Sequence, residues 1–180
     1  GCDLTKNQWI TLGKALRQVH EWGVPASIRA QMRHEIYSSK WREVVHSLYD
    51  HIDGNLTGDE TALNLQGFMK QHREVIHRLV DRAESLSQMI QQQSLEFVLC
   101  HSDIHGGNVL IEGNGALYIV DWDEPIMAPK ERDLMFIGGG VANIWNNPRE
   151  EASFYEGYGK TKINMPILAY YRHERIVEDR

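Results

Sequence analysis

The sequence has few cysteines and no long apolar run, and each shortage excludes a class of protein. Its 180 residues include only Cys2 and Cys100, too few for the disulfide framework of a small secreted domain. Cys100 lies in an apolar segment, where a reduced buried thiol is the usual state. No apolar run approaches the roughly 18 to 20 residues that cross a bilayer, and no signal peptide opens the chain. We therefore expect a reducing, cytoplasmic compartment and no membrane partner.

Basic residues are also in short supply. There are 19 Lys and Arg against 25 Asp and Glu, a net charge of -6, and no basic stripe for nucleic acid. An acidic chain suits a cationic small-molecule substrate, although solubility alone is a sufficient and more ordinary reason for such a charge. We expect no nucleic-acid partner, and the length predicts a single domain over residues 1–180.

Helical periodicity covers most of the chain. In the first segment Trp9, Leu12 and Leu16 recur at spacings of three and four, which predicts an amphipathic helix. Thr5 is suited to cap its start, and Pro25 to end it. The predicted helices are residues 5–22, 27–39, 41–52, 60–92, 131–137, 149–158 and 166–178.

The pattern over residues 60–92 is unusually long for a small domain. An unbroken helix of this length would span about 45 Å, so we expect a break either at Gly67 or near residues 85–87. The shorter helix before it, residues 41–52, is expected to end at Asp53-Gly54-Asn55.

Three short strands are predicted at residues 97–101, 108–111 and 116–120. Gly113-Asn114-Gly115 lies between the last two, and this composition predicts a hairpin turn. The expected fold class is α+β, mainly α-helical, with a small antiparallel β insert that carries a polar loop.

That polar loop lies within Val98–Ile111, which reads VLCHSDIHGGNVLI. Asp103 and Asn108 are five positions apart, and the next strand leads directly into Asp121. In kinase-like enzymes this order of Asp, Asn, strand and Asp serves phosphoryl transfer: the first Asp accepts the proton of the substrate hydroxyl, while the Asn and the second Asp hold magnesium. Each residue alone has an ordinary role in a turn, but the three in this order favour phosphoryl-transfer chemistry.

The two histidines of the loop leave another reading open. His101, Asp103 and His105 share one face of an extended chain, and such a cluster resembles the ligand set of a metal-dependent hydrolase. No second cluster of ligands completes such a site. We therefore favour a structural role for His101, with its imidazole bonding backbone groups of the loop.

Three further acidic residues follow the motif. Asp123 and Glu124 either face a cationic substrate or are simply solvated, and the sequence leaves both possibilities open. Asp133 lies in the first turn of a predicted helix, a position that the helix dipole alone explains. No Gly-rich loop followed by a strand lysine occurs in the sequence, so the nucleotide-anchoring half of a kinase is missing.

Together, His101–Asn108 and Ile119–Asp121 resemble the catalytic signature of the aminoglycoside phosphotransferase family, relatives of protein kinases that phosphorylate small molecules. Residues 98–140, together with Lys40–Glu43 and Tyr170–Arg175, resemble most the branch of that family that acts on spectinomycin, and the likeness covers about residues 12–180. It implies the C-terminal lobe of a protein-kinase-like fold, an antibiotic-resistance kinase with ATP and Mg²⁺ as its cofactors. Kinases of other small alcohols, such as choline, amino alcohols or sugars, share the signature.

The resemblance also implies roles for individual residues. Asp103 would be the catalytic base, and Asn108 and Asp121 the magnesium ligands. Asp123 and Glu124 remain possible substrate contacts. The residues that would support the catalytic loop are His101, His105 and Asp133.

The sequence departs from the pattern of kinases in two ways, and each changes what we expect of its activity. Asp121-Trp122-Asp123 stands where protein kinases carry Asp-Phe-Gly, so no activation-segment switching is expected. The N-terminal lobe with its lysine is absent and would be the main partner of this chain. We therefore expect the 180 residues alone to be inactive, with an apolar face that favours self-association; an inactive substrate-binding lobe is the non-enzymatic alternative.

Overall fold

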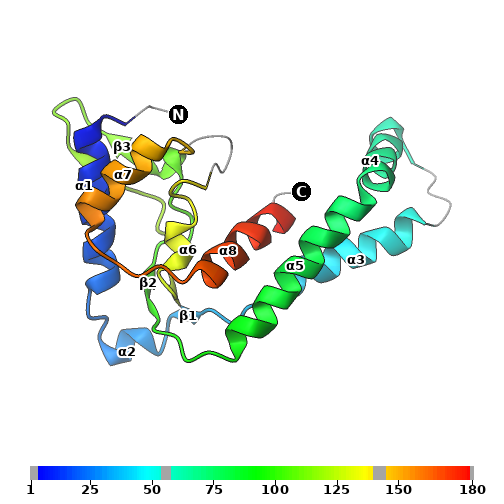
Figure 1. Ribbon diagram of the computed structural model, residues 1–180, viewed down its shortest axis with the longest axis horizontal. Helices are drawn as coiled ribbons and strands as arrows, with labels where there is room; N and C mark the ends of the chain where they lie inside the picture. The colour runs from blue at the N-terminus through cyan, green and yellow to red at the C-terminus, as the bar shows by residue number, and fades with distance from the viewer. Residues whose placement is uncertain (1–3, 54–57, 140–144, 179–180) are drawn as a thin grey trace. The chain divides into compact units, whose positions relative to one another are not determined.

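The computed structural model describes residues 4–53, 58–139 and 145–178. Its Cα positions divide the chain into two compact units (Figure 1). Unit 1 contains residues 1–35 and 94–168, and unit 2 contains residues 36–93 and 169–180. The polar loop and every site residue predicted above belong to unit 1.

Helix α1 opens unit 1 where the sequence predicts it. A capping box forms at its start, because the Thr5 side chain accepts from the Gln8 backbone N–H while the Gln8 side chain accepts from that of Thr5. The chain leaves the helix at Trp22, in an extended conformation, shortly before Pro25. The helices of this unit are α1 (Lys6–Glu21), α2 (Ala26–Arg29), α6 (Glu131–Leu134), α7 (Pro148–Tyr158) and the first turn of α8 (Met165–Glu178).

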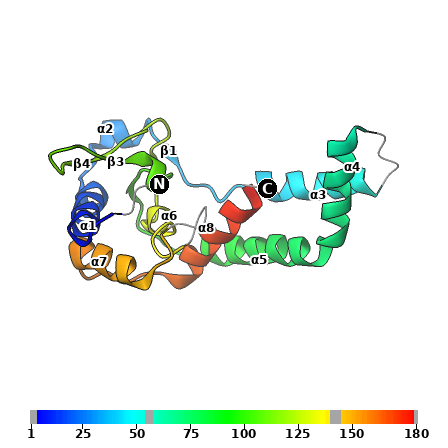
Figure 2. The ribbon, with the colours of Figure 1, turned by 90° about the horizontal axis from the view of Figure 1, so that it is seen from above.

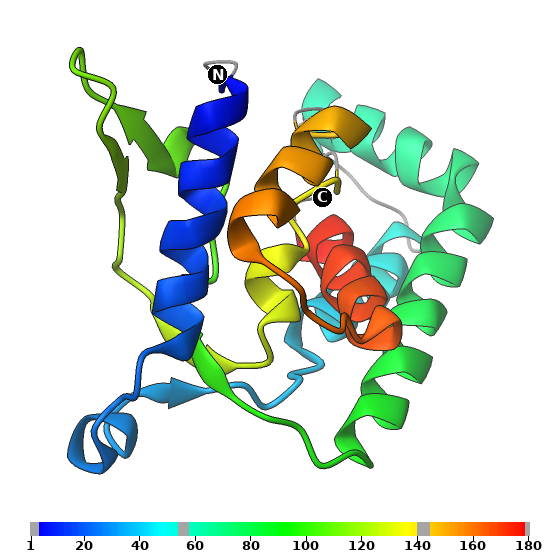
Figure 3. The same cartoon turned by 60° about the vertical axis from the view of Figure 1, so that its left-hand side comes forward.

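Helices α1 and α7 lie against each other at very short range (Figure 3). A Cβ atom on Gly13 would lie 2.2 Å from the carbonyl oxygen of Phe154, and one on Gly157 would lie 1.9 Å from that of Ile10. Only glycine permits so close an approach of two backbones. These two glycines therefore set how near the side chains of α7 come to those of α1.

A three-stranded sheet joins the start of unit 1 to its middle. Its order is β1–β5–β2, from Arg33–His34, Ile126–Ala128 and Val98–Cys100. β1 is parallel to β5 and β2 is antiparallel to it, with Leu99 opposite Met127. The predicted helix over residues 27–39 is wrong beyond Arg29, because residues 33–34 pair with the buried strand β5, a partner distant in the sequence. The sequence missed β1 and β5.

The predicted hairpin is confirmed. β3 (Val109–Ile111) pairs with β4 (Leu117–Ile119) in antiparallel register, with Leu110 opposite Tyr118. Gly115 lies in the turn with a φ of +87°, a conformation that suits glycine. The short 3₁₀ helix η1 (Gly106–Asn108) leads from the polar loop into β3.

Unit 2 is helical. It comprises α3 (Lys40–Ile52), α4 (Glu60–Gln71), α5 (Arg73–Gln91) and the remainder of α8. Buried side chains from these helices form one core: Tyr49, Ile52, Met69, Ile76, Val80 and Val177. The sequence predicts that α3 ends in a turn at Asp53-Gly54-Asn55, of which Gly54 and Asn55 lie outside the described residues. Cys2 also lies outside them.

The long helical pattern is broken, although not where the sequence suggests. The break falls at His72, which separates α4 from α5 (Figure 2), whereas Gly67 and residues 85–87 remain within helices. Tyr49 donates its hydroxyl to the carbonyl oxygen of the buried Met69 across 3.1 Å. This contact joins α4 to α3 close to the break, a tertiary interaction that the local sequence pattern does not show.

The fold class is confirmed as mainly helical with small β elements. Helix α6 ends at Leu134, three residues before the predicted end, and turns follow to Gly139; Gly140 of the predicted glycine break lies outside the described residues. Among the helices described, none has both the length and the apolar character needed to cross a membrane.

Candidate active site

Hydrogen bonds to the backbone of Asp103 hold the polar loop between β2 and η1 together. The carbonyl oxygen of Asp103 accepts hydrogen bonds from the His105 backbone N–H (3.0 Å) and from the side-chain amide of Asn108 (2.9 Å). The Asp103 side chain is 41% exposed, and its Oδ2 lies 3.4 Å from His105 Nε2. His105 Nδ1 in turn accepts from the Gly107 N–H across 3.0 Å. The loop thus presents one carboxylate, held by its backbone and open to a substrate.

Asn108 and the residue before Asp121 are joined directly. The Val120 N–H donates to the Asn108 carbonyl oxygen across 3.0 Å, which brings the end of β4 to the start of β3. Asn108 is buried and uses its amide nitrogen on Asp103, so its amide oxygen is the atom left to act as a ligand. Asp121 is exposed and has a φ of +66°, a strained conformation that is common at functional sites.

His101 is buried and bonded at both ring nitrogens. Its Nε2 donates to the Val120 carbonyl oxygen (2.8 Å), and its Nδ1 accepts from the Asp103 N–H (3.3 Å). Its ring meets that of Trp122 edge to face, with centroids 4.6 Å apart. With both nitrogens engaged, His101 joins the polar loop to the segment that leads into Asp121.

These bonds do not favour the metal-dependent hydrolase. Within residues 4–53, 58–139 and 145–178, the group of His, Cys, Asp and Glu side chains near enough to hold a metal ion is His20, Cys100 and Asp133. It does not include His101, Asp103 and His105.

Asp133 is fully buried and anchors the entry to the polar loop. Its Oδ2 accepts from the His101 N–H (2.9 Å) and its Oδ1 from the Ser102 N–H (2.7 Å). Ser102 has a φ of +76°, which costs a non-glycine residue on the order of 1 kcal/mol. The bonds to Asp133 are part of what holds that conformation.

The sequence analysis missed two residues beside Asp133: His20, which bonds Asp133, and Tyr158, which bonds His20. His20 of α1 bonds Asp133 Oδ2 through Nε2 (3.0 Å), and its Nδ1 lies 2.7 Å from the Tyr158 hydroxyl of α7. The available signal was the position of His20 in the buried stripe of α1, where it follows Leu16 by four residues. Burial raises the pKa of Tyr158 well above its ordinary value.

Asp123 and Glu124 both lie on the surface. Glu124 forms an ion pair with Arg33 of β1 across 2.8 Å, and the Arg33 guanidinium lowers the pKa of the Glu124 carboxyl. The backbone carbonyl of Glu124 also accepts from the Ser102 hydroxyl (3.0 Å). The Glu124 carboxylate is thus paired with a cation of this chain, and Asp123 is exposed.

Comparisons with known proteins show the family of this chain. The model of the phosphotransferase enzyme family matches residues 1–171. The chain is similar to spectinomycin phosphotransferase APH(9)-Ia, whose crystal structure in complex with ADP and spectinomycin has 56% sequence identity, a TM-score of 0.93, and coverage of 99% of this chain and 54% of that one. An AMP-bound complex of the same enzyme gives the same identity and TM-score, with 56% of that chain covered. No curated protein sequence matches the chain.

A more distant likeness concerns the fold alone. The choline kinase LicA from Streptococcus pneumoniae has 16% identity and a TM-score of 0.56, with coverage of 97% of this chain and 52% of that one. This chain therefore spans about half the length of each of these solved structures.

Proposed function

The chain belongs to the phosphotransferase enzyme family, and from that premise we propose that it is the C-terminal lobe of an ATP-dependent O-phosphotransferase. Its acceptor is a hydroxyl of a small molecule, an aminocyclitol antibiotic such as spectinomycin. The observation that carries the proposal is the high identity to a spectinomycin phosphotransferase over almost the whole of this chain. The loop built on Asp103 supplies a chemical rationale for it.

In this proposal Asp103 is the catalytic base. A carboxylate accepts the proton of the substrate hydroxyl as the hydroxyl oxygen bonds to the γ-phosphorus and the bond to the ADP oxygen breaks. The Asp103 side chain suits that role because it is 41% exposed while its carbonyl oxygen accepts two hydrogen bonds from within the loop. Positioning of this kind, together with electrostatic stabilisation, supplies most of the rate enhancement in phosphoryl transfer.

Asn108 and Asp121 would hold the magnesium ion. An amide oxygen and a carboxylate are the hard ligands that Mg²⁺ prefers, with water and phosphate oxygens completing the shell. The residues fit, since the amide nitrogen of Asn108 is already engaged and Asp121 is exposed beside it in the fold. When bound, Mg²⁺ neutralises charge on the phosphate oxygens.

Around these three residues, His101, His105 and Asp133 support the catalytic loop. Each bonds at least one backbone group of the loop or of the segment leading to Asp121. Asp123 is the acidic residue that we propose for contact with a cationic substrate, because Glu124 is already paired with Arg33.

We also propose that the two units together form one lobe and that the nucleotide-anchoring lobe lies outside these 180 residues, in line with the half-length coverage of the solved relatives. Leu110 and Tyr118 lie opposite each other on the hairpin beside Asn108 and are 52% and 51% exposed. Apolar surface of this kind suits contact with the missing lobe and, in its absence, self-association. We propose a cytoplasmic location, which the proposed use of ATP and the free buried thiol of Cys100 support.

A phosphate-transfer screen of the full-length protein tests the proposal. The acceptors are aminocyclitols, aminoglycosides, choline and amino alcohols, and ADP release is measured with and without each acceptor. We expect acceptor-dependent ADP release with spectinomycin that is lost in Asp103→Asn. Turnover with choline alone would show that the proposed substrate class is wrong and that the proposed reaction type is right. Release with none, together with stoichiometric zinc in the purified protein, would favour the metal-dependent hydrolase.

A further inference from the structure

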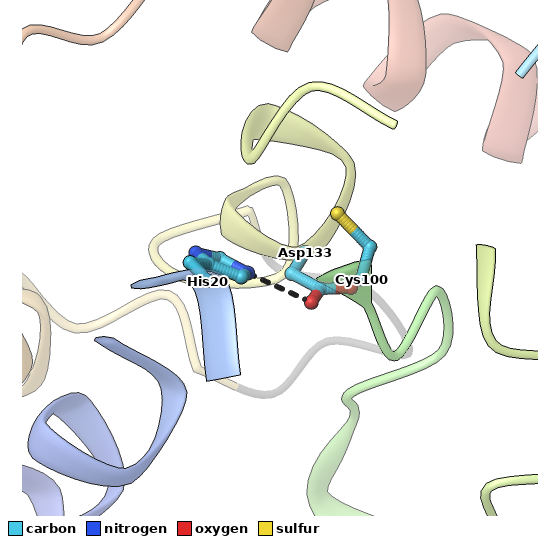
Figure 4. A group of neighbouring side chains, drawn as sticks. All are labelled: His20, Cys100 and Asp133. Carbon is cyan, nitrogen blue, oxygen red and sulfur yellow. Dashed lines mark hydrogen bonds and ion pairs between the residues drawn. The ribbon is translucent and has the colours of Figure 1, made fainter. Parts of the chain in front are cut away.

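A chain of buried polar groups connects α7 and α1 to the polar loop. The Tyr158 hydroxyl lies 2.7 Å from His20 Nδ1, and His20 Nε2 lies 3.0 Å from Asp133 Oδ2. These residues are 2%, 6% and 0% exposed. Figure 4 shows His20 from α1 and Asp133 from α6 pointing toward each other, with Cys100 of β2 beside them. Neither His20 nor Tyr158 has a place in the chemistry proposed above.

A metal site is one reading of this cluster, since the ligand atoms of His20, Cys100 and Asp133 lie within 4.8 Å of one another. The hydrogen bonds oppose it. Both oxygens of Asp133 already accept from N–H groups, and the Cys100 sulfur lies 3.6 Å from the carbonyl oxygens of Ala128 and Pro129, to which a thiol donates. A metal would also need the Cys100 thiolate. The cluster is therefore a hydrogen-bonded one.

The chemistry of these groups sets which one donates and which one accepts in each hydrogen bond. The Asp133 carboxylate accepts hydrogen bonds and donates none, so His20 Nε2 carries the proton that it donates. In the neutral imidazole, Nδ1 is then an acceptor, and the Tyr158 hydroxyl donates to it. Asp133 thus fixes the tautomer of His20, and the Tyr158 hydroxyl bonds the remaining ring nitrogen, Nδ1, and so helps to hold the imidazole in place.

We infer that His20 and Tyr158 are positioning residues for the transfer reaction, holding Asp133 in the one orientation in which its two oxygens bind the N–H groups of His101 and Ser102. The inference rests on the proposed function. Asp133 Oδ2 accepts from both His20 and His101, so rotation of the carboxylate would break the two bonds together. The strained backbone conformation of Ser102 depends on these hydrogen bonds of Asp133. The position of the next residue, Asp103, depends on them as well.

The alternative is that His20 is only a satisfied polar group in the core. Both readings predict lower stability when the chain of bonds is cut, so stability does not separate them. Only positioning predicts a loss of turnover in folded enzyme and a loosened His101–Ser102 backbone, because a displacement of about 1 Å near the reacting groups can cost up to about 100-fold in rate.

Turnover and substrate binding are to be measured separately in the full-length enzyme. Tyr158→Phe removes one hydroxyl, and we expect about a tenfold lower kcat with an unchanged nucleotide Kd. His20→Ala should lower kcat further. His20→Gln should restore part of it, because a glutamine places an N–H donor the same number of bonds from Cα as His20 Nε2. The matched control is Tyr155→Phe, which removes a hydroxyl one turn earlier on α7 and should keep the wild-type kcat.

Amide hydrogen exchange supplies a readout that does not depend on activity. In Tyr158→Phe the His101 and Ser102 amides should exchange several-fold faster than in wild type, while amides in the middle of α5 keep their rates. Wild-type kcat with unchanged exchange in Tyr158→Phe would overturn the inference. If the protein transfers no phosphate at all, the proposed function fails, but the exchange measurement still tests whether His20 and Tyr158 position the loop. Faster exchange of the two amides supports that role, and unchanged exchange refutes it.

Discussion

The side-chain amide of Asn108 donates a hydrogen bond to the backbone carbonyl oxygen of Asp103 across 2.9 Å. The proposed metal ligand therefore also holds the backbone of the proposed base. Substitutions at this position consequently have two effects, one on magnesium and one on the geometry of the loop, and the choice of replacement separates them.

The first prediction concerns magnesium. Asn108→Ala removes both the ligand oxygen and the bond to Asp103, so it should raise the magnesium concentration for half-maximal activity and lower kcat. Asn108→Asp keeps a ligand oxygen and loses the donor, so it should lower kcat with a smaller change in magnesium dependence. Asp121→Ala should raise the magnesium requirement most, because a charge is lost as well. Magnesium titrations of full-length variants measure this, with the exposed Asp81→Asn as control; identical curves for all would count against the site.

The second prediction concerns the base. Asp103→Asn in the full-length enzyme removes a proton acceptor with almost no change of shape, so transfer should fall by about 10² to 10⁴. The far-ultraviolet circular dichroism and the melting temperature should stay close to those of wild type. Initial rates at saturating ATP and acceptor provide the measurement, and turnover near the wild-type value would exclude Asp103 as the base.

The third prediction concerns the contact of α1 with α7. In Gly13→Ala the new Cβ would lie 2.2 Å from the Phe154 carbonyl oxygen and 2.6 Å from the Tyr158 nitrogen, and backbone has to move to admit it. We expect a loss of about 1–3 kcal/mol in the free energy of unfolding. Gly67→Ala is the matched control, since Gly67 lies in α4 with nothing within 4 Å of its Cβ position. That variant should be more stable by up to about 1 kcal/mol. Urea unfolding of both variants tests the contrast, and equal effects would contradict it.

The fourth prediction concerns alkaline pH. Burial raises the pKa of Tyr158 well above its ordinary value of 10.0, so the folded protein keeps a proton that the unfolded chain releases. The contribution to stability is complete below about pH 10 and declines as the pH rises further, by at most about 1.4 kcal/mol per pH unit. Urea unfolding between pH 9 and 11 should give a shallower decline for Tyr158→Phe than for wild type. Equal slopes in the two proteins would refute the assignment.

The fifth prediction concerns these 180 residues by themselves. In kinase-type catalysis a lysine of the N-terminal lobe holds the α- and β-phosphates, whereas the C-terminal lobe supplies the base and the metal ligands. The chain should therefore fold, bind ATP-Mg weakly and transfer no phosphate. Calorimetric titration of ATP-Mg into this chain and into the full-length protein makes the comparison. Comparable affinity in both would place the nucleotide site wholly within these residues and overturn the lobe assignment.

Local patterns predicted the elements that depend on local interactions. The helix cap at Thr5 and the hairpin at Gly113–Gly115 form where the sequence indicates, because a cap and a tight turn involve residues only a few positions apart. The strands Arg33–His34 and Ile126–Ala128 were missed, since neither is marked by a local turn or an alternating pattern. They form because strands distant in the sequence complete their hydrogen bonds: β1 pairs with β5, and β5 also pairs with β2.

The sequence by itself determined which side chains are available for the proposed chemistry: Asp103, Asn108 and Asp121, in that order and spacing, on a loop and a hairpin that local interactions build. Tertiary structure alone decided what holds them in place. His20 and Asp133 are 113 positions apart in the sequence and 3.0 Å apart in the fold, and the packing of α1 on α7 brings Tyr158 to His20. Such contacts arise when several elements pack at once, so no local spacing predicts them.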